Sequence, residues 1–126
     1  MSPQRAERIA PQHRMRTARD FARVREGGTA FRGRCCLLLV LPSPGDVTRL
    51  GWIASKRGVG NAVQRNRARR RIREIVRRRW PRVPHHGFLL VFIASRGALA
   101  ATHAQLASEL ESLLAHAGAL APAIGG

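Results

Sequence analysis

The sequence predicts an α+β protein, a two-layer α/β sandwich with the element order α-β-β-(β)-α-β-α. Two apolar runs, 34–41 and 88–94, have the length of single strands and predict the sheet. Residues 62–80 contain neither Gly nor Pro and carry apolar residues at helical spacing, which predicts a helical layer. With 126 residues, 44% of them hydrophobic, the chain is long enough for one modest core and too short for two.

The N-terminal part predicts a tail followed by a short helix. Residues 1–13 show no hydrophobic period, which is typical of a flexible tail. Thr17 occupies an N-cap position, and Phe21 and Val24 fall on one helical face three residues apart. We therefore expect a helix over 18–26.

A strand, a turn and a second strand are expected next. The run 34–41 is the first strand, and the bracketed strand of the predicted order allows for its being split in two. Pro42, Pro44 and Gly45 then predict a turn. A second strand over 49–55 follows at a spacing that suits a hairpin with a loop of about six residues.

The second half predicts a long basic helix, a buried strand and a last helix. The apolar face of the helix 62–80 consists of Ala68, Ile72, Ile75 and Val76. Together with strands 49–55 and 88–94 this helix should form a β-α-β unit, and most such units are right-handed.

The last helix begins at a capping-box pair, Thr102 and Gln105, and ends at Gly118. Its apolar face consists of Leu106, Leu110, Leu113 and Leu114. Residues 118–126 are expected to form a flexible tail, which leaves 14–117 as a single domain.

The charge of the chain predicts its class of partner. It contains 23 Lys or Arg against 7 Asp or Glu, a formal net charge of +16. An excess of like charge on this scale calls for a polyanion. All the basic residues except Lys56 are arginines, whose planar guanidinium matches phosphate. A GC-rich coding bias would explain the choice of Arg over Lys, but not the total charge.

The basic residues are densest in the long helix. Between Arg65 and Arg79 there are nine arginines, and only Glu74 offsets them. Like charges four residues apart weaken a helix, and solvated helix faces usually carry both signs. This density therefore predicts a surface that binds a polyanion.

The sequence gives no sign of an active site within the polypeptide. Glu109 and Glu111 are two positions apart on a helix, so their side chains do not face each other. No motif of a nucleophilic, nucleotide-binding or zinc site is present. We expect no catalytic residue and no metal ligand in the protein.

The cysteines and the apolar runs bear on location. Cys35 and Cys36 are neighbours, so we expect reduced thiols rather than a disulfide or a metal site. The longest apolar run is too short to span a membrane. These features predict a cytoplasmic protein without a membrane partner.

Composition favours RNA over DNA as the polyanion. No helix-turn-helix spacing, zinc-finger ligand set or heptad zipper is present, whereas RNA is often bound by shape and phosphate contacts. Only 5% of the residues are aromatic and none is Tyr. Stacking on bases would fall to Phe21, Phe31, Trp52 or Phe88, for each of which a place in the core is the default.

The segment 55–74, SKRGVGNAVQRNRARRRIRE, carries the most specific pattern. Its elements are Lys56-Arg57, Gly60-Asn61-Ala62-Val63, Arg65-Asn66-Arg67, and Arg70 to Glu74. This pattern resembles the signature of the bacterial ribonuclease P protein component. The flanking Arg19-Asp20-Phe21 and Arg49-Leu50-Gly51 agree, and the resemblance covers roughly 14–117.

The resemblance implies a specific function. Ribonuclease P is an endoribonuclease that removes the 5′ leader from precursor tRNA. Its catalytic subunit is an RNA that positions metal ions, chiefly Mg²⁺, for phosphodiester hydrolysis. The protein of this family binds that RNA through the helix of the RNR region, and it holds the single-stranded leader in a cleft between the sheet and the first helix. The family also implies the rare left-handed form of the β-α-β crossover.

Carried onto this chain, the resemblance assigns two sets of residues. Those implied to bind RNA are Lys56, Arg57, Asn61, Arg65, Asn66, Arg67, Arg69, Arg70 and Arg73. Those implied to bind the leader are Phe21 and Arg25. Similar proteins often have aromatic residues at the positions of Arg25 and Leu39, so here the leader should depend more on arginine.

Two other functions fit the charge. One is a basic ribosomal or other structural RNA-binding protein, and the other is a nucleoid-type DNA-binding protein. Copurified nucleic acid would separate the three: one stable RNA of a few hundred nucleotides, whole ribosomal subunits, or sheared DNA.

Overall fold

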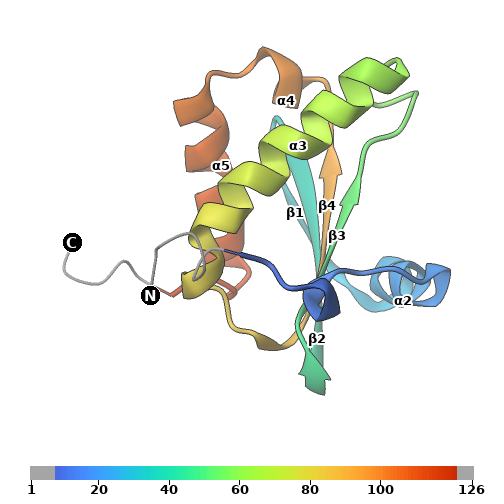
Figure 1. Cartoon of the computed structure of the whole chain (residues 1–126), viewed down its shortest axis with the longest axis vertical. Helices are drawn as coiled ribbons and strands as arrows, with labels where there is room; N and C mark the ends of the chain where they lie inside the picture. Colours follow the sequence, from blue (N-terminus) through green and yellow to red (C-terminus); the bar gives the residue numbers. More distant parts are fainter. Residues whose placement is uncertain (1–7, 122–126) are drawn as a thin grey trace.

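The computed structural model describes residues 8–121 and contains one sheet with helices on both faces. Its elements are η1 (Pro11–His13), α2 (Ala18–Gly27), β1 (Thr29–Arg32), β2 (Cys36–Val47), β3 (Arg49–Ile53), α3 (Ala62–Arg79), η2 (Trp80–Arg82), β4 (His86–Ala94), α4 (Gly97–Ala100) and α5 (His103–His116). Helices α3 and α5 cover one face of the sheet, and α2 lies on the other (Figure 1). The predicted α+β class is confirmed.

The strand order is β1-β2-β4-β3. β2 is antiparallel to β1 and to β4, and β3 is parallel to β4. The optional strand of the predicted order is β1, which precedes the apolar run instead of dividing it. The predicted hairpin between 34–41 and 49–55 is wrong, because β4 lies between these strands.

The reason is the apolar character of β4. Leu89, Leu90, Val91 and Phe92 are each at most 1% exposed. A strand whose successive side chains are all buried needs cover on both faces and a neighbour on both edges. The edge position therefore falls to the less apolar β3.

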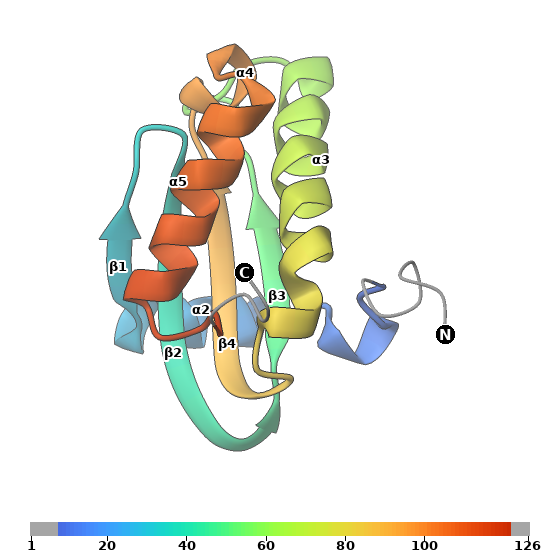
Figure 2. The same ribbon diagram turned by 90° about the vertical axis from the view of Figure 1, so that its left-hand side faces the viewer.

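The predicted turn at Pro42, Pro44 and Gly45 is also wrong, since β2 continues to Val47. The register of β2 against β4 shifts between Pro42 and Val47. Proline has no N–H to donate but fits an extended backbone, so it interrupts the ladder without ending the strand. This lower part of β2 curves beneath the sheet (Figure 2).

The β3-α3-β4 crossover is left-handed. In Figure 2, β3 and β4 both run upward, α3 lies in front of the sheet, and β4 lies to the left of β3. A right-handed unit would place the second strand to the right. The crossover thus departs from the general preference for the right-handed form, as the family resemblance implied. As a result, α3 lies beside the free edge of β3.

The periodic helices form as predicted. In α3, the predicted apolar face is at most 2% exposed; in α5, Leu106, Leu110 and Leu114 are fully buried and Leu113 is 7% exposed. Reciprocal hydrogen bonds between Thr102 and Gln105 make the predicted capping box. Gly118, with φ of 74°, follows the helix.

Parts of both predicted tails pack on the domain. Ile9 is buried, and the imidazole of buried His13 lies 2.7 Å from the carbonyl oxygen of Thr48. At the other end Ala119 is fully buried. Ile9, His13 and Ala119 thus contact the core, while the flexibility of both tails stays a prediction, and the rest of both segments lies outside the described residues.

Glu109 of α5 ties the β1–β2 turn to the helical layer. Its carboxylate accepts the backbone N–H groups of Arg34 and Cys35, each at 2.8 Å. A Cβ at Gly33 would lie 2.5 Å from a carboxylate oxygen of Glu109, so a larger residue there would displace this side chain. Two charge-assisted hydrogen bonds thus fix the turn on α5.

We predict that Glu109→Ala lowers the free energy of unfolding by about 1–3 kcal/mol, because two backbone donors lose a charged acceptor. Urea denaturation measures the change. Glu26→Ala is the control: Glu26 is exposed on α2, and its loss should change stability by less than about 0.5 kcal/mol. Equal stability of the two variants would contradict this role for Glu109.

Candidate nucleic-acid interface

The turn between β3 and α3 presents two of the predicted RNA-binding residues. Lys56 and Arg57 are exposed, while Val59 is buried and anchors the turn. The backbone carbonyl of Ser55 accepts the N–H of Val59 at 2.9 Å, and its hydroxyl accepts that of Gly58 at 2.8 Å. The two cations therefore project from a turn held in one conformation.

Asn61, also predicted to bind RNA, begins α3. Its side chain accepts the N–H of Gln64 at 2.9 Å, and the Gln64 side chain accepts the Asn61 N–H at 2.9 Å. Gly60 precedes this capping box with φ of 142°, in the region that favours glycine. The amide oxygen of Asn61 is thus used to cap the helix, and its NH₂ group remains for a ligand.

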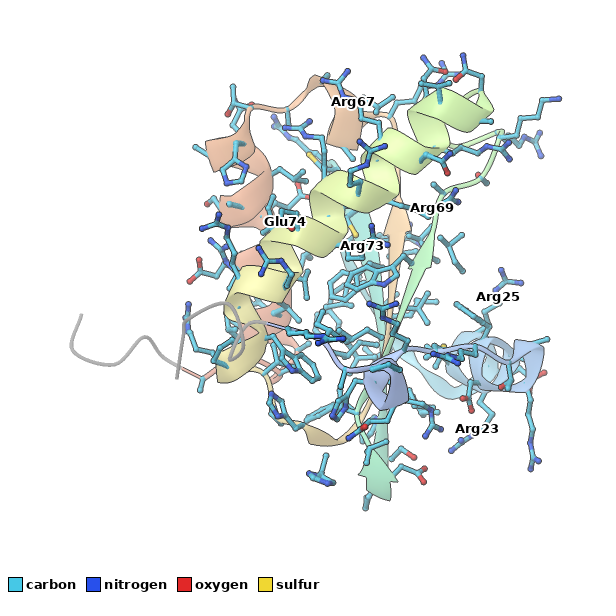
Figure 3. The ribbon with its side chains drawn as sticks, in the orientation of Figure 1. Arg23, Arg25, Arg67, Arg69, Arg73 and Glu74 are labelled. Atoms are coloured by element: carbon cyan, nitrogen blue, oxygen red, sulfur yellow. The ribbon has the colours of Figure 1, made fainter. Side chains whose placement is uncertain are left out.

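Five arginines of α3 lie on two adjoining parts of its surface. Arg65, Arg69 and Arg73 lie one turn apart on the flank toward β3, where Figure 3 shows Arg69 and Arg73. Arg67 and Arg70 lie on the exposed face. We call these five residues the α3 arginine surface. They place all the predicted arginines of the helix on connected faces.

Other arginines of the helix stabilise the fold. Arg71 donates through Nη2 to the carbonyl oxygen of Ala101 at 2.7 Å and also binds the carbonyls of Ala98 and Leu99, which end α4. At the end of α3, Arg79 pairs with Glu111 of α5 at 3.2 Å. These guanidinium groups are therefore occupied within the protein.

Glu74 neutralises only the last turns of α3. Arg77 donates through Nε to its carboxylate at 3.0 Å, and Arg78 lies 3.7 Å from it. The Arg77 hydrogen bond, the largest cause, lowers the pKa of Glu74 despite a smaller opposing effect of desolvation. Glu74 therefore stays ionised below neutral pH, and within residues 8–121 the arginines of α3 that precede Arg73 have no carboxylate partner.

Several cations of the interface have no acidic partner. Within residues 8–121, Lys56, Arg57, Arg67, Arg70 and Arg73 form no ion pair or hydrogen bond through their side chains. Their charges repel one another in the free protein. A ligand with closely spaced negative charges would remove that repulsion.

Asn66 and Arg65 are placed differently from the exposed cations. The side-chain oxygen of Asn66 accepts from Arg69 on the same helix, so it contacts neither the preceding turn nor another element. The Nε of Arg65 is buried and lacks a partner within the described residues. Its terminal guanidinium nitrogens remain available at the edge of the surface.

A second surface lies on the α2 face of the sheet. Leu37, Ile93 and Ile53 stand in register across β2, β4 and β3. All three are half-buried, and Ile53 and Ile93 belong to the cluster around Met15 and Val24. The row they form is an apolar strip that α2 leaves partly open.

Phe21 and Arg25 border this strip from α2. They line one surface pocket with Ala18, Ala22 and Glu26, which confirms that they face the same side of the helix. A Cβ at Gly51 would lie 2.6 Å from a ring carbon of Phe21, so the ring packs directly over the backbone of β3. Arg25 extends from α2 toward the end of the sheet where α3 begins, and Arg23 extends the opposite way (Figure 3).

The position of α2 depends on an ion pair. Asp20 accepts from Nε of Arg49 in β3 at 3.0 Å, while its backbone N–H is capped by Thr17 at 3.2 Å. Sequence analysis used Asp20 only as part of the family pattern. It also missed the open apolar strip, because the predicted hairpin paired the wrong strands. The alternation of Leu37 and Leu39 was the signal that could have revealed this strip.

The remaining candidate groups do not form a reactive site. Among residues 8–121, no cluster of three or more His, Cys, Asp or Glu side chains is placed to hold a metal ion. Cys35 and Cys36 are free and buried; burial raises the pKa of the Cys36 thiol to about 12, and burial followed by the Glu109 carboxylate raises the pKa of Cys35. No helix in this part of the chain is long and apolar enough to cross a bilayer.

Comparison with known proteins decides which polyanion is bound. The family model described as Ribonuclease P matches residues 9–118. The chain belongs to the ribonuclease P protein family. Ribonuclease P protein components from Chloroflexus aurantiacus and Roseiflexus castenholzii are 41% and 38% identical to it, over 83% and 89% of this chain and 77% and 91% of those proteins.

Solved structures agree with the family assignment. The ribonuclease P protein of Staphylococcus aureus superposes with a TM-score of 0.75 at 26% identity, over 93% of this chain and 98% of that one. The Thermotoga maritima protein gives a TM-score of 0.71 at 27% identity, over 82% and 96%. These relatives favour the ribonuclease P reading over a ribosomal protein and make RNA the partner.

We predict that Arg67→Gln/Arg70→Gln weakens binding to a bacterial ribonuclease P RNA and reduces the slope of log K against log salt by about 1–2 units, because two phosphate contacts are lost. Filter binding between about 50 and 200 mM salt measures both. The melting temperature should hold or rise slightly, since like charges are removed from one helix.

The matched control is Arg32→Gln/Arg96→Gln, which removes the same charge at exposed positions outside α3. Its affinity should fall less and its slope should change less. Equal effects of the two double variants would show that net charge alone governs binding and would exclude a localised interface.

Proposed function

We propose that this chain is the protein subunit of ribonuclease P, which assists an RNA subunit in removing the 5′ leader of precursor tRNA. The family match over 9–118 supports this proposal, and the observation that carries it is the α3 arginine surface without acidic partners. In this proposal the RNA subunit cuts the phosphodiester bond and the protein supplies binding and orientation.

The α3 arginine surface is proposed to bind the ribonuclease P RNA. Its flank extends over at least Arg65 to Arg73, about 12 Å at 1.5 Å per residue, and Lys56 and Arg57 continue it beyond the helix. Guanidinium groups bind phosphate oxygens in a bidentate way. Counterion release then makes the contact strong and dependent on salt.

The surface formed by Phe21 and Arg25 of α2 and the apolar strip beside them, which we call the leader groove, is proposed to bind the single-stranded leader. Phe21 offers an aromatic side for stacking, and the strip of Leu37, Ile53 and Ile93 offers apolar contact to bases. Arg25 on the same rim supplies a cation for the leader phosphates. A mature tRNA lacks these nucleotides, so the groove discriminates between substrate and product.

Mg²⁺ is proposed to be held mainly by the RNA subunit. The described residues do not fit a metal site, since they contain no cluster of three His, Cys, Asp or Glu ligands. The two free buried cysteines suit a reducing compartment, and we propose the cytoplasm as the place of action.

Reconstitution tests the function directly. The protein mixed with a bacterial ribonuclease P RNA and Mg²⁺ should increase cleavage of precursor tRNA at the mature 5′ end, as measured by gel analysis of end-labelled substrate. The protein without RNA should cleave nothing. Absence of any stimulation at saturating protein would contradict the proposal.

For the leader groove, we predict that Phe21→Ala lowers the affinity of the reconstituted enzyme for precursor tRNA by about tenfold to a hundredfold, which corresponds to stacking worth about 1–3 kcal/mol. Affinity for mature tRNA should not change. Because Phe21 also packs over Gly51, the melting temperature is measured beside both affinities.

Two further variants separate contact from packing. Phe21→Leu keeps an apolar side chain over β3 and should still lose precursor affinity. Phe88→Leu alters a half-buried ring that packs against the core on the α3 side and should leave precursor preference intact. Equal losses for precursor and mature tRNA in a destabilised Phe21 variant would assign Phe21 to the core alone.

A further inference from the structure

A further basic pocket lies beside the outer edge of β3. Its volume is about 410 Å³, within the range of about 300–1,000 Å³ of small-molecule sites. The side chains that matter here are Arg8, Arg14, Trp52, Arg73, Glu74 and Arg77. They come from the N-terminal segment, β3 and α3, and only Arg73 belongs to the interface described above.

Trp52 provides an aromatic wall of this pocket. It stands in register with Phe92 of β4, and the two rings stack at a centroid distance of 5.0 Å and an angle of 20°. Phe92 is 1% exposed and lies outside the pocket, whereas Trp52 is only half-buried. The pocket therefore adjoins the part of the indole that Phe92 leaves uncovered.

In the described part of the chain β3 is an edge strand, so no further strand of residues 8–121 lies beside that part of the indole. The N-terminal segment lies there instead, where the N–H of Met15 donates to the carbonyl of Leu50 at 2.8 Å and Arg14 forms a parallel bridge with Leu50. This pairing fixes the backbone of Arg14 against β3. Arg14 is thus held at the pocket.

The charge around the indole is unbalanced. Four guanidinium groups and one carboxylate line the pocket and leave a net charge of +3. The carboxylate is Glu74, which Arg77 already engages at 3.0 Å. Within residues 8–121, Arg8, Arg14 and Arg73 are exposed and form no side-chain hydrogen bond or ion pair. An anion would complement these positive charges.

We propose that this pocket binds one unpaired nucleotide of an RNA, with the base stacked against Trp52 and its phosphate bound by Arg14 and Arg73. An aromatic ring beside converging arginines is the arrangement by which proteins hold single-stranded nucleic acid, and stacking is tolerant of base identity. The source of the nucleotide, the RNA subunit or the precursor tRNA, rests on the proposed function. The binding chemistry does not.

A mononucleotide tests the chemistry alone. Titration with adenosine 5′-monophosphate at low salt should quench the fluorescence of Trp52 with saturation, and ribose 5-phosphate, which lacks the base, should quench far less. Trp80 is 2% exposed and provides a constant background. Arg14→Gln should weaken the apparent affinity severalfold, whereas Arg32→Gln should not. Quenching that is unsaturable, or the same in Arg14→Gln, would overturn the proposal.

Larger RNAs identify the source. Trp52→Leu keeps an apolar side chain against Phe92, and removing one stacked base should cost about tenfold or more in affinity. A loss for ribonuclease P RNA assigns the nucleotide to the RNA subunit, and a loss confined to precursor tRNA in the reconstituted enzyme assigns it to the leader. Trp52→Phe should restore most of the binding. Unchanged affinity for both RNAs would overturn the proposal.

Two controls keep the outcomes separate. If Trp52→Leu lowers the melting temperature strongly, Arg14→Gln, which leaves the core intact and lies outside the α3 arginine surface, decides the result by the same assays. If the wild-type protein fails to bind ribonuclease P RNA, the proposed function fails, while the mononucleotide titration still decides whether the pocket exists as a site.

Discussion

The fold depends on the burial of β4 on both of its faces. Its central residues are at most 1% exposed, so one helical layer alone could not cover the strand. The α3–α5 layer and α2 are therefore both required, and they are forced onto opposite sides of the sheet. The edge strand β3 is left between them. The two surfaces proposed to bind RNA follow from this constraint, since one belongs to α3, the other to α2, and both meet at β3.

The arginines of α3 have two different roles, which their interaction partners distinguish. Arg71 ends α4 through three carbonyls, and Arg79 joins α3 to α5 through Glu111. Each of these contacts is made within the folded chain and lies on the side of α3 away from β3 or at its end. Among residues 8–121, the exposed cations Arg67, Arg70 and Arg73 form no such contact. Their mutual repulsion costs a few tenths of a kcal/mol per pair, which the core of α3 offsets by burying its apolar face. One side of the helix thus stabilises the fold, and the other is the side proposed to bind RNA.

The sequence predicts the helices well and the sheet poorly, and the cause is the range of the interactions. Ile72 or Leu110 is buried by a local period, and Thr102 caps its helix three residues away, so both are visible in a short window of sequence. The neighbour of β3 is β4, which lies beyond the whole of α3, so no local pattern reveals that it displaces β2. The same non-local pairing creates the strip of Leu37, Ile53 and Ile93 and brings Arg14 to Trp52. The RNR motif located the α3 surface, whereas these other surfaces needed coordinates.

Charge and shape make different contributions to RNA recognition. Phosphate contacts are alike along every RNA, so the α3 arginine surface supplies affinity that falls steeply with salt and carries little information about the substrate. Precursor and mature tRNA offer the same kind of phosphate contact, and they differ in the single-stranded leader, which only the precursor carries. In the proposed function, a preference for the precursor comes from contacts that require unpaired nucleotides, and the half-buried Phe21 and the apolar strip beside it are among the proposed contacts. Few such neutral groups face solvent in the described residues, while cations are many. Changes at Phe21 or the strip should therefore alter substrate preference far more than equal losses among the arginines. On this proposal, the high net charge governs how tightly the protein binds, and a small number of uncharged side chains governs which RNA it prefers.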